Sequence, residues 1–278
     1  MLADYSKAEL LKAARRPASW VLVGIAVVGL ILFSYLFTYI FVISAQEGNA
    51  PSGIDPDDIL QPLLPENVLA VVLANFAGLS TAVAVVFGAL IVGSEYGWGT
   101  FKLVLSQRTG KLNILYGKVL AIAAILGGLC VLILIVGILC SALVAGLQDK
   151  PADWPSAWNV IKGTGAGWLI LFAWTSLGVF LATLFRGAAL AIGVGLVYSF
   201  VVEGLALGLP IQGDTFENIQ KIFLGKNAID LASAFGELPQ TVPQQGQPVE
   251  AGQAAAVLLV YTTAFLVISG LLFRSRDV

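Results

Sequence analysis

Six long runs of apolar residues alternate with polar and charged segments along this chain. They cover residues 20–43, 68–93, 119–147, 163–185, 188–207 and 254–273. A membrane-spanning helix needs about 20 mostly apolar residues, because the hydrocarbon core is about 30 Å thick and a helix rises about 1.5 Å per residue. The runs lack the apolar and polar alternation of a barrel strand. The pattern therefore predicts an all-α polytopic membrane protein with six transmembrane helices in a single domain, residues 1–278.

The composition agrees with this prediction and narrows the chemistry. Of the 278 residues, 58% are hydrophobic and 12% are charged, which is typical of a membrane protein and not of a soluble one. With no histidine in the chain, we expect no zinc or haem site. Cys130 and Cys140 are ten residues apart on one predicted helix, about 15 Å along its axis, so we expect two buried thiols and no disulfide between them.

The sequence also lacks the motifs of an ATPase or a hydrolase. No G-x-x-x-x-G-K-[ST] phosphate-binding loop occurs, and without histidine there is no Ser-His-Asp nucleophile set. We therefore expect no catalytic residue, no cofactor and no metal ion in this chain. The formal net charge of −2 gives no indication of a nucleic-acid partner.

The distribution of basic residues predicts the orientation. Cytoplasmic connections of membrane proteins are enriched in lysine and arginine. With six spans, four basic segments fall on one side, and they contain Lys7, Lys12, Arg15, Arg16, Lys102, Arg108, Lys111, Lys118, Arg186, Arg274 and Arg276. The opposite side carries the acidic residues Glu47, Asp55, Asp57, Asp58 and Glu66. Both termini are therefore expected in the cytoplasm.

Two segments outside the spans are expected to hold short helices. Residues 1–17 predict an amphipathic helix along the inner membrane surface, capped by Ser6 and Glu9; an ordinary basic flank of the first span is the alternative. Residues 208–251 predict an external loop in which apolar residues recur at helical spacing, so one or two short amphipathic helices are expected at the outer interface.

Few polar residues lie inside the predicted spans. Glu203 is the only carboxylate clearly within one, near the outer end of the fifth, and Asn75 begins a mildly polar stripe with Ser80 and Thr81 in the second. Ionisable groups inside a membrane often mark a transport path, so Asn75 and Glu203 are candidates for one. For Glu203, local pairing at the outer interface is the alternative.

Residues 94–118, SEYGWGTFKLVLSQRTGKLNILYGK, separate the second and third spans. Aromatic and aliphatic residues are interleaved with basic ones, which predicts a short amphipathic element at the inner face. Such an element suits contact with a cytosolic protein, and anchoring in the membrane interface would use the same residues.

This segment resembles the signature of permease subunits of type 2 ABC transporters (the ABC-2 type). In that family an acidic residue closes the second span, a Gly-Thr pair opens a coupling element, and a Gly-Lys pair begins the third span. The matching positions are Glu95, Gly99, Thr100, Arg108, Gly117 and Lys118. One departure is the turn at 107–109, where many members of the family carry proline.

The resemblance implies a transmembrane permease subunit of an ATP-binding cassette exporter. Such a chain would pair with a second permease copy or homologue and with two separate cytosolic ATPase subunits, which bind ATP and Mg²⁺, in the cytoplasmic membrane of a prokaryote. Residues 94–118 would be the coupling segment. The expected ATPase-docking residues are Glu95, Trp98, Gly99, Thr100, Phe101, Lys102, Arg108 and Lys111, with Glu95 paired to a basic group of the ATPase.

Two other functions are compatible with the same pattern. A self-sufficient secondary transporter or channel would move its substrate without an ATPase and would be sensitive to Glu203. A membrane scaffold would bind a partner and transport nothing. Peptides, lipids, antibiotics and ions all remain possible substrates for these helices.

Overall fold

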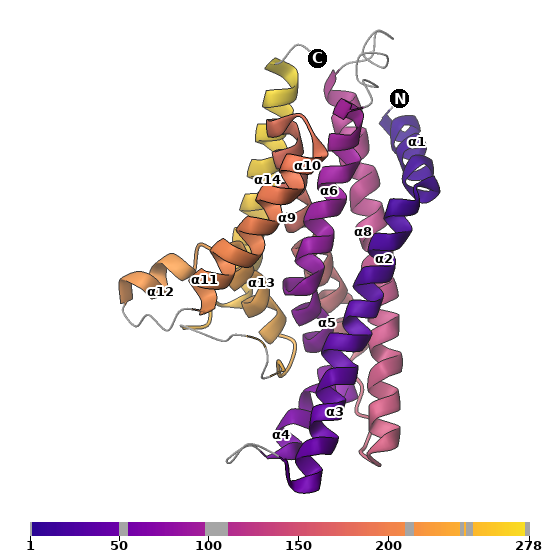
Figure 1. Ribbon diagram of the computed structural model, residues 1–278, viewed down its shortest axis with the longest axis vertical. Helices are drawn as coiled ribbons and strands as arrows, with labels where there is room; N and C mark the ends of the chain where they lie inside the picture. The colour runs from indigo at the N-terminus through magenta and orange to yellow at the C-terminus, as the bar shows by residue number, and fades with distance from the viewer. Residues whose placement is uncertain are drawn as a thin grey trace.

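The protein is an elongated bundle of helices in which both termini lie at the same end (Figure 1). We call this the terminal end, at the top of Figure 1, and the opposite end the far end. The computed structural model describes residues 2–49, 55–97, 111–208, 214–239, 242 and 247–275.

The first half of the chain forms a helix at the terminal end, a long broken helix that descends from it, and a returning pair of helices. The elements are α1 (Leu2–Arg15), α2 (Pro17–Gly29), η1 (Leu30–Leu36), α3 (Phe37–Ser44), η2 (Ala45–Asn49), α4 (Pro56–Leu60), η3 (Gln61–Leu63), η4 (Pro65–Asn67), α5 (Val68–Ala77) and α6 (Leu79–Gly97). Elements η1 and η2 are π-helical, and η3 and η4 are 3₁₀-helical.

The second half contributes three long helices, a further broken one and two short ones. These are α8 (Lys111–Leu147), α9 (Ala157–Phe185), α10 (Ala188–Leu196), the π-helical η5 (Val197–Val202), α11 (Glu203–Gly208), α12 (Asp214–Gln220), α13 (Leu224–Ser233) and α14 (Ala251–Ser275). No strand occurs in the ranges described.

Six helical stretches within the described ranges are long and apolar enough to cross a membrane. They are Pro17–Glu47, Leu79–Tyr96, Leu115–Leu147, Ala157–Phe185, Ala188–Gly208 and Ala251–Ser275. The predictions of an all-α fold and of six spans are confirmed, and the chain is a multi-pass membrane protein.

The second span differs from the prediction, because the run over 68–93 is not one continuous helix. It breaks at Gly78, whose φ of −102° and ψ of −109° lie outside the helical range, and α5 and α6 form on either side. A further bend of 58° separates Pro56–Leu63 from Pro65–Ala77. The hydropathy pattern does not reveal such breaks, because the residues on both sides are equally apolar.

Polar side chains around Gly78 satisfy the groups that the break exposes. The Thr81 hydroxyl donates to the Gly78 carbonyl oxygen at 2.7 Å, and the Ser80 hydroxyl donates to Asn75 Oδ1 at 2.8 Å. Asn75 Nδ2 donates in turn to Ser34 Oγ on η1 at 3.4 Å. Since unpaired polar groups are costly in lipid, this part of the sequence needs its polar stripe.

Helices α6 and α9 form the centre of the bundle, and glycines allow their backbones to touch. A Cβ atom at Gly88 would overlap the carbonyl oxygen of Thr175, and one at Gly178 would overlap that of Val85. Close backbone approach at small residues drives helix association in lipid, where the hydrophobic effect between helices is absent. The α6–α9 pair is therefore the fixed frame on which the other helices pack.

One or two short helices were predicted for the segment between the last two spans, and it contains two, α12 and α13, but α13 is not a surface helix. Residues Leu224–Ala232 are all buried, and α13 packs against α5 and α14. Its buried ionic side chains have partners: Asp230 accepts from Lys226 Nζ at 2.9 Å and from the Val249 amide at 3.0 Å. These contacts, made across long sequence distances, have no signature in local periodicity.

The N-terminal helix also begins earlier than expected. Because α1 starts at Leu2, Ser6 and Glu9 lie within it, and the capping box predicted for them is wrong. Glu9 has a different role, which depends on α6 and α8.

We predict that Gly178→Ala destabilises the bundle by about 1–3 kcal/mol, the usual cost of overpacking a core, because the new methyl group meets backbone and not a flexible side chain. Gly128→Ala is the matched control, since its Cβ would meet nothing within 4 Å. Unfolding midpoints in detergent compare the two. Equal midpoints would show that α6 and α9 are not in backbone contact.

Candidate functional site

Helices α1, α6 and α8 meet at the terminal end, and a glycine brings two of them together. A Cβ atom at Gly117 on α8 would lie 2.8 Å from the Cβ atom of Tyr5 on α1. No larger residue fits there without moving α1. Gly117 therefore allows α1 to lie directly against the start of α8, and it places the next residue, Lys118, opposite Glu9.

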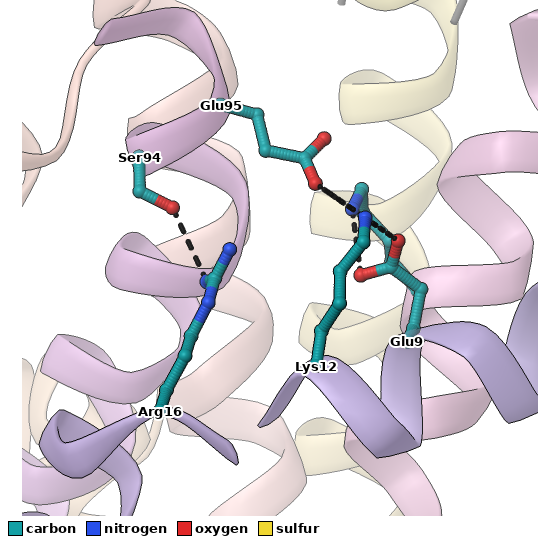
Figure 2. A network of polar contacts seen from close by, with 6 residues as sticks. Glu9, Lys12, Arg16, Ser94 and Glu95 are labelled. Carbon is teal, nitrogen blue, oxygen red and sulfur yellow. Dashed lines mark hydrogen bonds and ion pairs between the residues drawn. The ribbon is translucent and has the colours of Figure 1, made fainter. Parts of the chain in front are cut away.

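Four charged side chains from these helices form an ion cluster, defined as Glu9 and Lys12 of α1, Glu95 of α6 and Lys118 of α8. Lys118 Nζ lies 2.5 Å from Glu95 Oε1 and 2.8 Å from Glu9 Oε2. Lys12 Nζ lies 2.6 Å from Glu9 Oε1 and 3.2 Å from Glu95 Oε1. Figure 2 shows Lys12 and Glu9 rising from α1 towards Glu95. Each lysine bridges both carboxylates, so the formal charges of the cluster cancel.

The ion cluster is largely shielded from solvent. The Lys118 side chain is 1% exposed and the Glu95 side chain 6%, whereas Lys12 is 45% exposed at the edge. A buried ammonium group without a partner is very costly, and removing one member of a buried pair costs about 3–5 kcal/mol. Lys118 therefore needs the carboxylates of Glu9 and Glu95 as partners. These contacts fix the positions of α1, α6 and α8 relative to one another.

The pKa directions of the two α1 members agree with charged forms at neutral pH. Burial raises the pKa of Glu9, but attraction to Lys118 and hydrogen bonds from Lys118 and Lys12 outweigh it and leave the pKa below 4.5. Burial lowers the pKa of Lys12, but its hydrogen bond to Glu9 and attraction to Glu9 and Glu95 leave the pKa above 10.5. Glu9 and Lys12 therefore both carry their charge at neutral pH.

A further contact joins the first span to α6 beside the cluster. Arg16, which precedes α2, donates from Nη1 to Ser94 Oγ at 3.2 Å (Figure 2). The turn between α1 and α2 is therefore tied to the residue next to Glu95.

The ion cluster links the two ends of residues 94–118, the segment that the sequence analysis identified as the coupling segment. Glu95 is two residues before the end of α6, and Lys118 is seven residues after Lys111, which begins α8. Six of the expected docking residues lie outside the described residues: Trp98, Gly99, Thr100, Phe101, Lys102 and Arg108. The sequence analysis related Glu95 to Lys118 only as two positions of one motif and did not predict a contact between them. Their ion pair joins the two ends of that motif.

Sequence reasoning missed the partners of Glu95. It assigned that carboxylate to a basic group on another subunit, whereas the structure pairs it with Lys12 and Lys118 of its own chain. One signal was available: Glu95 and Glu9 are the acidic residues closest to the most basic segments of the chain, and an acid at the end of a span needs a nearby cation.

The two candidates for a transport path lie elsewhere. Asn75 belongs to the polar contacts around Gly78 described above. Glu203 is buried, and its carboxylate accepts hydrogen bonds from the backbone amides of Leu224, at 3.1 Å, and Gly225. A carboxylate is favoured at this position, because the first amides of a helix have no partner within the helix. Glu203 therefore holds the start of α13, which is the local pairing that the sequence left open.

Within the described ranges, no group of three or more cysteine, aspartate and glutamate side chains is placed to hold a metal ion. The carboxylates of the ion cluster are instead occupied by lysines.

We predict that Lys118→Met lowers the free energy of unfolding by about 3 kcal/mol or more, because two buried carboxylates then share only Lys12. The control is Lys150→Met, which removes an exposed ion pair to Asp57 at 3.2 Å and should cost less than about 1 kcal/mol. Denaturant titration of both variants in detergent micelles measures the difference. Equal losses would mean that Lys118 is not a buried partner.

Comparison with known protein families places the chain. The profile described as ABC-2 family transporter protein matches residues 6–278, which is nearly the whole sequence and includes every member of the ion cluster. A comparison with curated proteins finds no match. With six membrane-spanning helices and this match over their full extent, the chain belongs to the ABC-2 family of transporter proteins and is a membrane permease of the ABC transporter class.

Proposed function

We propose that this chain is the transmembrane permease subunit of an ATP-binding cassette exporter in the cytoplasmic membrane of a prokaryote. It pairs with a second permease, identical or homologous, and with two separate cytosolic ATPase subunits that bind ATP and Mg²⁺. The observation that carries the proposal is the buried ion cluster at the base of residues 98–110, between α6 and α8.

The terminal end is the cytoplasmic end in this proposal. It carries α1 with its basic residues, and both α6 and α8 have an end there (Figure 1). The far end holds the acidic loop before α5. This arrangement agrees with the enrichment of basic residues in cytoplasmic segments, and it presents residues 98–110 to a cytosolic partner.

A force applied to residues 98–110 can be transmitted to the membrane-spanning helices through direct contacts. Glu95 and Lys118 join the ends of α6 and α8 at the base of the segment. Helix α6 then packs against α9 through Gly88 and Gly178. Movement imposed by an ATPase at residues 98–110 would therefore move α6, α8 and α1 as one unit, and the break at Gly78 is a point where α5 can respond differently from α6.

The roles of the docking residues divide accordingly. Glu95 is engaged within the chain, so it positions the segment, while Trp98 and Phe101 supply the apolar contacts and Lys102, Arg108 and Lys111 face acidic groups of the ATPase. Buried aromatic anchors carry most of the binding free energy at such interfaces, and charges at the rim set recognition. Gly99 and Thr100 lie between these two aromatic residues in the sequence and complete the proposed docking set.

Asn75 and Glu203 have structural roles in this proposal, at the Gly78 break and at the start of α13. Their contacts therefore support an ATP-driven permease more than a self-sufficient carrier, which would need an accessible ionisable group inside the membrane.

We predict that Phe101→Ala, combined with Arg108→Glu, lowers retention of the cognate ATPase by at least about tenfold, as expected from the loss of one anchor and the reversal of one charge. The unfolding midpoint of the isolated permease should not change, because neither residue belongs to the ion cluster. Affinity purification of the tagged permease with its ATPase, and nucleotide-dependent transport in vesicles, measure both effects.

Lys150→Glu at the far end is the matched charge-reversal control and should leave ATPase retention unchanged. Full retention and full transport by the double variant would remove residues 98–110 from the mechanism. Transport by the purified permease alone, with no ATPase present, would overturn the proposed function itself.

A further inference from the structure

An apolar groove lies in the angle between α1 and α2 at the terminal end. It has a volume of about 390 Å³ and is lined by Leu10, Leu11, Ala14, Trp20, Val23 and Ile125, with almost no polar surface. Leu11 and Trp20 are 61% and 65% exposed. A groove of this size and composition is suited to a hydrocarbon chain and not to a polar solute.

Trp20 forms one wall of the groove in a fixed orientation. Its indole Nε1 donates to the carbonyl oxygen of Ala14 at 2.8 Å, which spans the angle between α1 and α2. Tryptophan is typical of the membrane–water interface, where one part of the ring is apolar and the other is polar. The groove therefore lies where the headgroups and the first part of the acyl chains meet the protein.

Basic side chains flank the apolar lining along α1. Lys7 and Arg15 are four residues before and after Leu11, so on a helix both lie on the same stripe as this lining residue. Both are exposed. The other face of α1 carries Glu9 and Lys12 of the ion cluster, whose charges cancel. Among the side chains that the structure describes, the exposed charge on this stripe of α1 is therefore positive.

The groove also adjoins a small cavity deeper in the bundle. That cavity, of about 30 Å³, shares Ser19, Val23 and Ile125 with the groove and reaches Ser80 and Leu171 on α6 and α9. An occupant of the groove therefore contacts α1, which carries Glu9 and Lys12 of the ion cluster, and α8, which carries Lys118.

We propose that this groove is a binding site for one anionic phospholipid, with an acyl chain against Leu11, Trp20 and Ile125 and the phosphate beside Lys7 and Arg15. Charge complementarity selects the headgroup, and the apolar lining holds the chain. The bound lipid fixes the angle between α1 and α2 and so supports α1 against α8 at the ion cluster. This site does not depend on an ATPase or on a transported substrate.

Trp20 provides a direct reporter for the site. The full-length protein is reconstituted in phosphatidylcholine vesicles that contain increasing fractions of dibrominated phosphatidylglycerol or, separately, dibrominated phosphatidylcholine, since bromine quenches tryptophan fluorescence on contact. The quenching lost in Trp20→Phe is the Trp20 signal. Trp158→Phe is the matched control, because Trp158 is equally exposed, at 62%, but lies at the start of α9 and far from the groove.

We expect half-maximal quenching of Trp20 at a mole fraction of the anionic lipid at least about fivefold lower than that of the zwitterionic lipid, which is the contribution of about one basic residue near a membrane surface. The Lys7→Gln, Arg15→Gln double variant should abolish this preference. Trp158 should show no preference in any variant.

A second variant tests the acyl chain. Ala14→Leu fills the groove and should raise the half-maximal fraction of the anionic lipid, whereas Ala18→Leu, outside the lining, should not. Equal quenching of Trp20 by the two lipids, a preference that survives removal of Lys7 and Arg15, or indifference to Ala14→Leu would each overturn the site and leave only ordinary lipid contact.

Discussion

The burial of one ammonium group determines how the terminal end of this protein is built. Lys118 is 1% exposed and lies between the carboxylates of Glu9 and Glu95. Each carboxylate comes from a different helix, so satisfying one lysine fixes α1, α6 and α8 relative to one another. The cost of leaving such a charge unpaired in a low-dielectric interior exceeds that of most single packing defects. Gly117, which lets α1 approach α8, serves this interaction.

The need to pair Lys118 explains physically why the motif in residues 94–118 has an acidic residue at one end and a lysine at the other. The acidic residue that closes the second span and the Gly-Lys pair that begins the third are separated by more than twenty residues, yet they form one ion pair. In the proposed function, the intervening residues contact an ATPase while the pair holds their ends together. A segment anchored in this way transmits displacement to the helices, whereas a loosely attached loop would absorb it.

Much of the fold was predictable from hydropathy, because six runs of apolar residues leave helices as the only means of pairing their backbone groups in lipid. The break at Gly78 was not, since the residues on either side are equally apolar and only Asn75, Ser80 and Thr81 indicate that polar groups need partners there. The burial of α13 was also beyond local pattern, because Asp230 finds the Val249 amide and Glu203 finds the Leu224 amide only after the chain has folded. For the ion cluster, Glu95 was identified as important, but the second carboxylate of the cluster, Glu9, was assigned to a capping box on a helix that in fact begins four residues before Ser6.

The central claim is that Glu95 and Lys118 interact directly and hold the base of the segment between α6 and α8. A double-mutant cycle with Glu95→Gln, Lys118→Gln and the combined variant, followed by denaturant unfolding of the full-length protein in bilayers, measures that interaction alone. The account predicts a coupling free energy of about 0.5–3 kcal/mol, the range for residues in one hydrogen-bond or salt-bridge network. Additivity of the two single variants within about 0.5 kcal/mol, as found for independent sites, would contradict it.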